Sequence, residues 1–144
     1  MRYSNIINYH LRIKMRTIVI LLSVNILLFS DMKVITSQQN SLLAVDKDTL
    51  SAIYLKKVTS VDNKHITPID NIADYNEFYK KVVKKTPQQV HSYWMKEIFT
   101  GKKRPPKKVL AKDLEKNLQE NTTAITYSTG KIKSIQTKVI YEVK

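Results

Sequence analysis

The most informative part of the sequence is TPQQVHSYWMKEIFTGKKRPP, residues 86–106. Its first residues form a capping box, in which Thr86 and Gln89 satisfy each other's backbone N–H groups and proline occupies the first helical position. Gly101 is the residue type that most often ends a helix. The stretch therefore predicts a helix that ends at Gly101. Three large apolar residues at four-residue spacing predict its packed face: Val90, Trp94 and Ile98.

A dense basic loop follows this helix. Pro105 and Pro106 forbid a helix there, so residues 102–108 are predicted to be extended. The loop is either a contact for an anion, a nucleic acid or a membrane surface, or simply solvated. Trp94 and Phe99 are not interleaved with its charges and no base-reading module is recognisable, which argues against nucleic acid. The cations of this basic loop are Lys102, Lys103, Arg104, Lys107 and Lys108.

The rest of the chain predicts strands alternating with helices. Asp46 and Asp74 stand where helix N-caps are expected, with Leu43 as a hydrophobic staple for the first of these helices. A leucine pattern from Leu110 to Leu118 predicts a last helix. Pro68 favours an edge position for its strand. The predicted strands are residues 33–36, 66–69, 124–127 and 134–143; in the last, one face is formed by Ile135, Thr137, Val139 and Tyr141.

This order of elements predicts the fold class α/β, with a small mixed sheet flanked by helices. Residues 31–144 are expected to form the single domain. Residues 1–30 read as a signal peptide or an N-terminal hydrophobic segment, because Arg12, Lys14 and Arg16 precede an uncharged apolar run, 17–30. The run is short for a membrane span. We expect export, with an uncleaved interfacial anchor as the alternative; Met15 is an alternative start to Met1.

Composition excludes several classes of function. The chain has no cysteine, which removes disulfides, thiolate catalysis and cysteine metal sites. Its only glycines are Gly101 and Gly130, too few and too far apart for a P-loop, a dinucleotide fingerprint or a nucleophile elbow. His65 and His91 lack metal-ligand spacing. We therefore expect no enzyme activity, no cofactor and no metal. The formal net charge of +13 indicates attraction for anions of every kind.

Several short motifs occur together in one order along the chain. They are Phe78-Tyr79, Thr86–Gln89, Tyr93-Trp94, Ile98–Lys102, Pro105-Pro106 and Ala124–Tyr127. In this combination the chain resembles short proteins related to the periplasmic phosphate-binding component of phosphate ABC transporters, over roughly residues 33–128. The resemblance implies one lobe of a type II periplasmic binding protein. A single lobe cannot enclose an anion alone, so a homodimer or another partner is expected to complete a deep site.

The resemblance also indicates where ligand residues should lie, and where this chain departs. Relatives place a serine, glycine, threonine and arginine cluster where this chain has residues 71–76, with no arginine and with Asp74, which repels phosphate. The loop after the first strand is the other oxyanion candidate, with an ordinary strand-to-helix loop as the alternative. The candidate ligand-binding residues are Thr36, Ser37, Gln38, Asn71 and Asn76.

Two functions follow as hypotheses. The first is a periplasmic, phosphate-binding-like, non-catalytic protein associated with an ABC uptake system, whose ligand would be phosphate or another oxyanion. The second is an envelope protein-interaction or membrane-surface module that uses the basic loop, residues 102–108.

Overall fold

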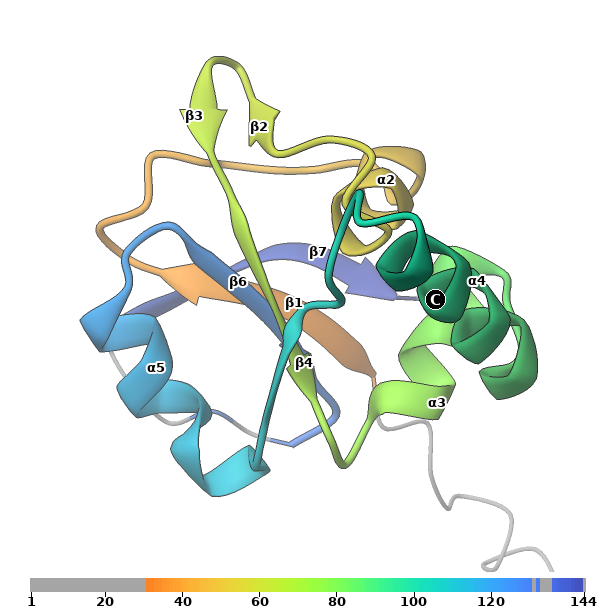
Figure 1. Ribbon diagram of the computed structural model, residues 1–144. Coiled ribbons are helices and arrows are strands. Elements are labelled where there is room, and N and C mark those ends of the chain that lie inside the picture. The colour runs from red at the N-terminus through yellow and green to blue at the C-terminus, as the bar shows by residue number, and fades with distance from the viewer. Residues whose placement is uncertain (1–30, 131, 133–135, 144) are drawn as a thin grey trace, which may run out of the picture.

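The computed structural model describes residues 31–130, 132 and 136–143. Its main element is a five-stranded mixed sheet with the strand order β5-β4-β6-β1-β7 (Figure 1). β4 runs parallel to β5 and β6, whereas β1 runs antiparallel to both β6 and β7. The predicted α/β class with a mixed sheet is confirmed. The strands are β1 (Met32–Ser37), β4 (Thr67–Asn71), β5 (Lys107–Val109), β6 (Ala124–Ser128) and β7 (Thr137–Val143).

Helices cover both faces of this sheet. One face carries a cluster of buried side chains under α2, α3, η2 and α4, and the other carries a smaller cluster under α5. Val34 and Ile35 show the alternation, since these neighbours belong to different clusters. The helices are α2 (Lys47–Tyr54), α3 (Tyr75–Phe78), the π-helix η2 (Tyr79–Val83), α4 (Pro87–Phe99), the 3₁₀ helix η3 (Ala111–Asp113) and α5 (Leu114–Glu120).

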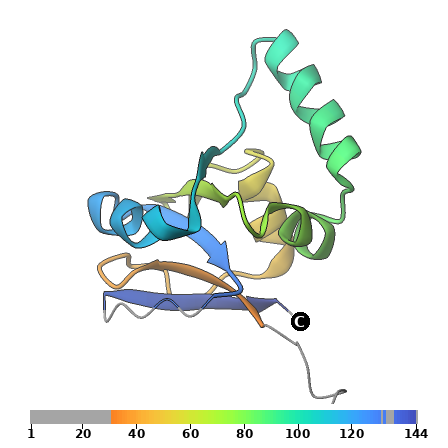
Figure 2. The same cartoon turned by 90° about the horizontal axis from the view of Figure 1, so that it is seen from below.

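The helix predicted from residues 86–101 is confirmed as α4. Both capping-box bonds between Thr86 and Gln89 are present, and Gly101 has a φ of 67° just beyond the helix. Val90 and Trp94 are buried, but Ile98 is 47% exposed, so the predicted packed face is wrong at its last position. Figure 2 shows the reason: α4 stands off from the sheet, and its chain returns to the sheet only through the segment that leads to β5.

Pro68 lies in an interior strand, which corrects the expectation of an edge. β4 stands between β5 and β6, but β5 is so short that it pairs only with residues 69–71. Pro68 itself has a partner in β6 alone, opposite Ile125. The proline therefore occupies a place where one side of the strand forms no ladder, and its missing N–H costs no sheet hydrogen bond.

The predicted face of the last strand is also wrong. Ile140 and Val143 are buried, whereas Val139 is 44% exposed. The cause is a β-bulge: the register against β1 shifts between Val34 and Ile35, whose partners are Tyr141 and Val139. An extra residue reverses the alternation of side chains that follows it. The beginning of this predicted strand, residues 134 and 135, lies outside the described residues.

Three further expectations fail at helix ends. Leu43 is 81% exposed and is no staple, and Leu110 is 50% exposed and precedes η3. Asp74 occupies the N-cap position of α3 but makes no capping hydrogen bond. A tight hairpin between β2 (Ser60–Val61) and β3 (Lys64–His65) extends away from the sheet (Figure 1).

Candidate functional site

The five predicted ligand-binding residues lie near the carboxyl ends of β1 and β4, two strands that run in opposite directions. Asn71 is the last residue of β4, and β4 runs parallel to β6. Thr36 and Ser37 end β1, which runs antiparallel to β6 and pairs Thr36 with Ile125, near the start of β6. Because β1 runs opposite to β4, their carboxyl ends are separated by the length of the strands. The structure therefore does not bring these residues together into one anion site.

The loop after β1 has few free donors. The Thr36 hydroxyl donates to the carbonyl of Ala124 at 2.7 Å, and the backbone N–H groups of Gln38 and Asn40 donate to carbonyls at 2.6 and 3.0 Å. The Gln39 N–H donates to the Ser37 hydroxyl at 3.3 Å. The described residues that line a hollow at this place are one hydroxyl side chain and four amides: Ser37, Gln38, Gln39, Gln119 and Gln136.

In the turn after β4, the polar side chains also form hydrogen bonds within the protein. The Asn71 side chain donates to Asp74 at 2.8 Å and to the Tyr127 carbonyl at 3.2 Å, and accepts from the Ala73 N–H. The Asp74 carboxylate also accepts two hydrogen bonds from Thr129. Asn76 is exposed on α3. These bonds tie the turn to the end of β6 and place a carboxylate where an anion would have to bind.

The basic loop is the other predicted site, and most of its cations are available to solvent. Lys103 is half-buried and forms an ion pair with Glu97, with 3.9 Å between Nζ and Oε2. Lys107 donates to the Asn117 side chain at 3.2 Å. Lys108 lies over the ring of Tyr75, 4.1 Å from its centroid. Among the residues that the structure describes, four loop cations have no acidic partner: Lys102, Arg104, Lys107 and Lys108.

The predicted extended conformation is confirmed at the end of the basic loop, where it becomes a strand, whereas Lys102 at its start lies in a bend. Lys107 and Lys108 form the first two residues of β5 and pair with Ile69 and Asp70 of β4. Both lysines remain exposed, because β5 is the outermost strand of the sheet. The basic loop thus runs from the end of α4 onto the sheet edge, which fixes the position of its last two charges.

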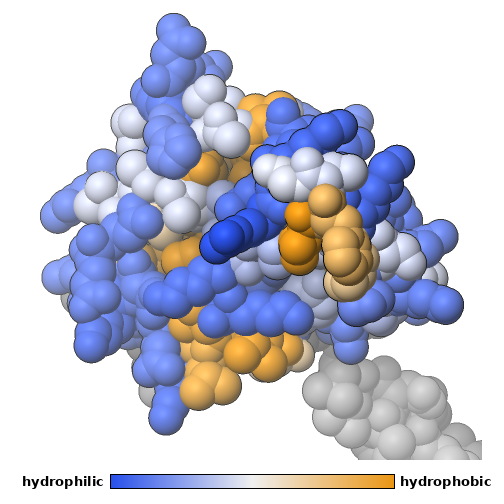
Figure 3. Space-filling view, in the orientation of Figure 1, coloured by the Kyte–Doolittle hydropathy of each residue, from blue (hydrophilic) through white to orange (hydrophobic). Residues whose placement is uncertain are grey.

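Apolar side chains border the basic loop, which the sequence did not indicate. Phe99 is 81% exposed and Ile98 47% exposed at the end of α4. Figure 3 shows apolar residues surrounded by hydrophilic ones at this place. A hollow of about 330 Å³ combines one of these apolar side chains with the cations of the loop: it is lined by Ile98, Gly101, Lys102, Lys103 and Arg104.

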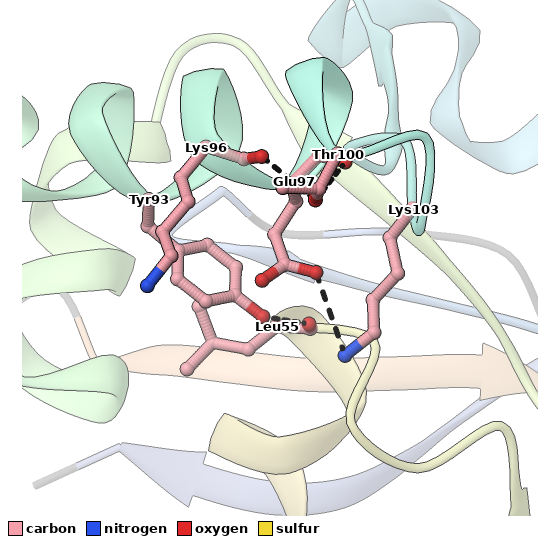
Figure 4. A network of polar contacts seen from close by, with 6 residues as sticks. All are labelled: Leu55, Tyr93, Lys96, Glu97, Thr100 and Lys103. Atoms are coloured by element: carbon pink, nitrogen blue, oxygen red, sulfur yellow. Dashed lines mark hydrogen bonds and ion pairs between the residues drawn. The ribbon is translucent and has the colours of Figure 1, made fainter.

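Polar contacts hold the end of α4 against the body of the protein (Figure 4). The Tyr93 hydroxyl donates to the carbonyl of Leu55 at 2.7 Å, just beyond α2. The Thr100 hydroxyl donates to the Lys96 carbonyl at 2.9 Å and so closes the last turn. With the ion pair of Glu97 and Lys103, these bonds position the start of the basic loop relative to α2.

A buried carboxyl group is the feature that sequence reasoning missed. Asp70 has no exposed surface, and its oxygens accept hydrogen bonds from Tyr127 at 3.0 Å and Tyr79 at 3.3 Å. Burial raises the pKa of Asp70 to about 7, although these hydroxyls and the charges of Lys108 and Lys56 lower it. No signal in the sequence indicated this burial, because Pro68 two residues earlier favoured an edge strand.

The described residues show neither a metal-binding cluster nor a membrane-spanning helix. They contain no group of three or more histidine, aspartate or glutamate side chains placed to hold a metal ion. None of their helices is both long and apolar enough to cross a membrane.

Comparison with known proteins finds a likeness to a solved structure. No family model matches the chain, and no curated protein matches it. An ABC-type phosphate transport receptor from Vibrio cholerae is similar in structure, with a TM-score of 0.47 and 15% sequence identity. The match covers 76% of this chain and 45% of the receptor chain, so the present chain spans less than half of that receptor.

Proposed function

We propose that this chain is a non-catalytic binding protein that recruits an anionic partner through its basic loop. The observation that carries this proposal is the distribution of charge at the end of α4. From Ile98 to Lys112 the chain has six basic residues and no acidic one. Four of them lie in the loop without an acidic partner among the described residues, and two of these four, Lys107 and Lys108, are held in the extended strand β5.

The rest of the protein strengthens this attraction. The chain has a formal net charge of +13, and the field of such a protein concentrates anionic partners near its surface. The contribution of exposed charges falls off over a Debye length of about 8 Å at physiological ionic strength. Because the loop cations follow one another along the chain, a single anionic surface can contact several of them at once. Binding is therefore expected to weaken as salt is added.

Neutralising three loop cations is expected to weaken binding to a soluble polyanion by roughly two orders of magnitude. The variant is Lys102→Gln/Arg104→Gln/Lys107→Gln, and each exposed cation close to a polyanionic surface contributes about 1 kcal/mol. The measurement is the Kd of the full chain for poly-L-glutamate at low salt and at physiological salt. The wild type should lose most of its affinity at the higher salt.

A matched control removes the same charge elsewhere. Lys57, Lys64 and Lys80 are exposed and lie outside the basic loop, so Lys57→Gln/Lys64→Gln/Lys80→Gln has the same net charge as the loop variant. It should lose less than about fivefold in affinity, through the general field alone. Equal losses in the two variants would contradict a local site and leave only nonspecific charge attraction.

Phosphate is a second candidate ligand, and its support is the resemblance of residues 78–106 to phosphate-binding relatives. On this proposal the chain is exported and acts beside an ABC uptake system. A specific site should raise the melting temperature in phosphate by several degrees, because a ligand at 100 times its Kd adds about 2.7 kcal/mol. Sulfate and chloride at matched ionic strength are the controls. Equal shifts in all three salts would remove phosphate as a specific ligand.

A further inference from the structure

We infer that the anionic partner of the basic loop is the surface of an anionic lipid bilayer, into which Phe99 inserts. This inference rests on the proposed function and names the partner of the same site. A soluble polyanion needs only cations for binding. The end of α4 also presents two large apolar side chains to water, Phe99 at 81% and Ile98 at 47% exposure. An anionic bilayer is charged at its surface and apolar beneath it, which matches both properties.

The two kinds of side chain lie side by side. Ile98 lines the same hollow as Lys102, Lys103 and Arg104. In an interfacial contact of this type, an apolar side chain enters the boundary between headgroups and acyl chains, while Lys and Arg extend their charged ends to the headgroups. Gly101, with a φ of 67°, turns the chain directly after the helix. The loop cations therefore follow Phe99 within a few residues and can reach the phosphates around it.

The end of α4 that carries Ile98 and Phe99, here called the apolar tip, is held in place by the rest of the fold. Val90 and Trp94 are buried in the core, and the Tyr93 hydroxyl is bonded to the carbonyl of Leu55. The following turns of α4 stand away from the sheet (Figure 2). A tip that projects and is fixed at its base loses little conformational freedom when it binds. The protein can thus present Phe99 to a flat surface without rearrangement of its core.

Charge complementarity argues for a bilayer that is anionic. No acidic residue lies between Ile98 and Lys112 in the sequence, Glu97 is largely buried and paired with Lys103, and Asp70 beside β5 is fully buried. Each Lys or Arg close to an anionic leaflet strengthens binding about fivefold. Insertion of one phenylalanine adds about tenfold or more. Both contributions are needed, because a single apolar residue gives only weak attachment to a neutral bilayer.

The test uses an indole at the tip as a local probe in the full chain. F99W is mixed with vesicles of equal parts phosphatidylglycerol and phosphatidylcholine, with and without brominated acyl chains. The introduced indole should shift to shorter wavelength and be quenched by the brominated lipid. Trp94, the only native tryptophan, is 5% exposed and serves as an internal reference that contacts no lipid.

L43W is the matched control. Leu43 has the same exposure as Phe99, 81%, but belongs to the connection between β1 and α2. Both variants keep residues 1–30, so any attachment through that segment is common to them. Lipid contact in F99W and none in L43W supports the inference. Equal responses, or no response in F99W, overturn it.

A second measurement separates this inference from the proposed function. Phe99→Ser should weaken vesicle binding about tenfold or more and leave binding to poly-L-glutamate unchanged. If the loop cations govern polyglutamate binding but Phe99→Ser has no effect on vesicles, the proposed function stands and an acidic protein becomes the partner. If the loop cations do not affect polyglutamate binding, the proposed function itself fails. Displacement from vesicles by inorganic phosphate, beyond its ionic strength, overturns the bilayer in favour of a phosphate site.

Discussion

Replacing Asp70 by asparagine is expected to stabilise the protein by as much as about 4 kcal/mol above pH 7. Near pH 4 the stability should remain nearly unchanged. The reason is the burial of Asp70, which raises the pKa of its carboxyl group from 3.8 to about 7. One unit of pKa corresponds to about 1.4 kcal/mol of difference between the two protonation states. An asparagine has the same shape and cannot ionise.

The direction of this effect with pH follows from the protons bound in each state. Between about pH 4 and pH 7 the folded protein keeps the proton on Asp70, whereas the unfolded chain has released it. The wild type therefore loses stability as the pH rises through this window, and above pH 7 the full cost of the buried charge is present. The measurement is the melting temperature of both proteins at pH 4.5, 6 and 8. At the highest pH the melting temperature of D70N should exceed that of the wild type by on the order of 10 °C.

Two variants serve as controls for this result. Asp31→Asn removes an exposed carboxyl group, and its melting temperature should follow the wild type at every pH. Tyr127→Phe removes a hydroxyl that donates to Asp70 and lowers its pKa. In that variant the pKa of Asp70 should rise further, so the loss of stability should begin near pH 4 as in the wild type but continue to a higher pH. A D70N protein with the same pH dependence as the wild type would show that this carboxyl group is not the one responsible.

Truncating Phe78 is expected to cost about 3–5 kcal/mol of stability, a large part of what a domain of this size possesses. Phe78 has no exposed surface, and its ring stacks on Tyr127 at 3.7 Å between centroids, with 3° between the planes. Its ring also meets Tyr54 edge-on at 4.5 Å. Phe78→Ala would leave a cavity at the centre of this aromatic cluster. Urea unfolding measures the loss as a lower midpoint with an unchanged slope.

Phe99→Ala is the matched comparison, since Phe99 is also a phenylalanine at the end of a helix. Its side chain is 81% exposed, so truncation should change stability by less than about 0.5 kcal/mol. A comparable loss in both variants would show that Phe99 packs against the protein. In that case it could not be the free apolar tip on which membrane binding depends.

Short-range signals along the chain predicted the parts of the fold that depend on neighbours in sequence. The capping box at Thr86 and the glycine at position 101 delimit α4 because both act within one helical turn. Strands β1, β4 and β6 follow from short β-branched runs. The basic loop follows from charge and proline alone, although its last two lysines belong to β5.

The candidate site depended on contacts between distant segments, which one sequence does not reveal. Thr36 and Asn71 both lie near the carboxyl end of a strand, so both were predicted to bind the same anion. However, β1 runs antiparallel to β4, and the two residues therefore lie at opposite ends of the strands. Their side chains donate hydrogen bonds to carbonyl groups far along the chain, Thr36 to Ala124 and Asn71 to Tyr127. Strand direction is decided by the packing of the whole sheet and leaves no local mark.

The sequence alone was enough to predict an α/β fold, a capped helix and a loop that combines cations with two prolines. It also shows that the chain has no cysteine and no glycine-rich motif for catalysis. These properties are local, because each needs only residues within a few positions of one another. Only the tertiary structure decided that Ile98 and Phe99 remain in water while Trp94 is buried, and that Asp70 lies among tyrosines. Exposure depends on which segments pack over a residue, and those segments come from anywhere in the chain.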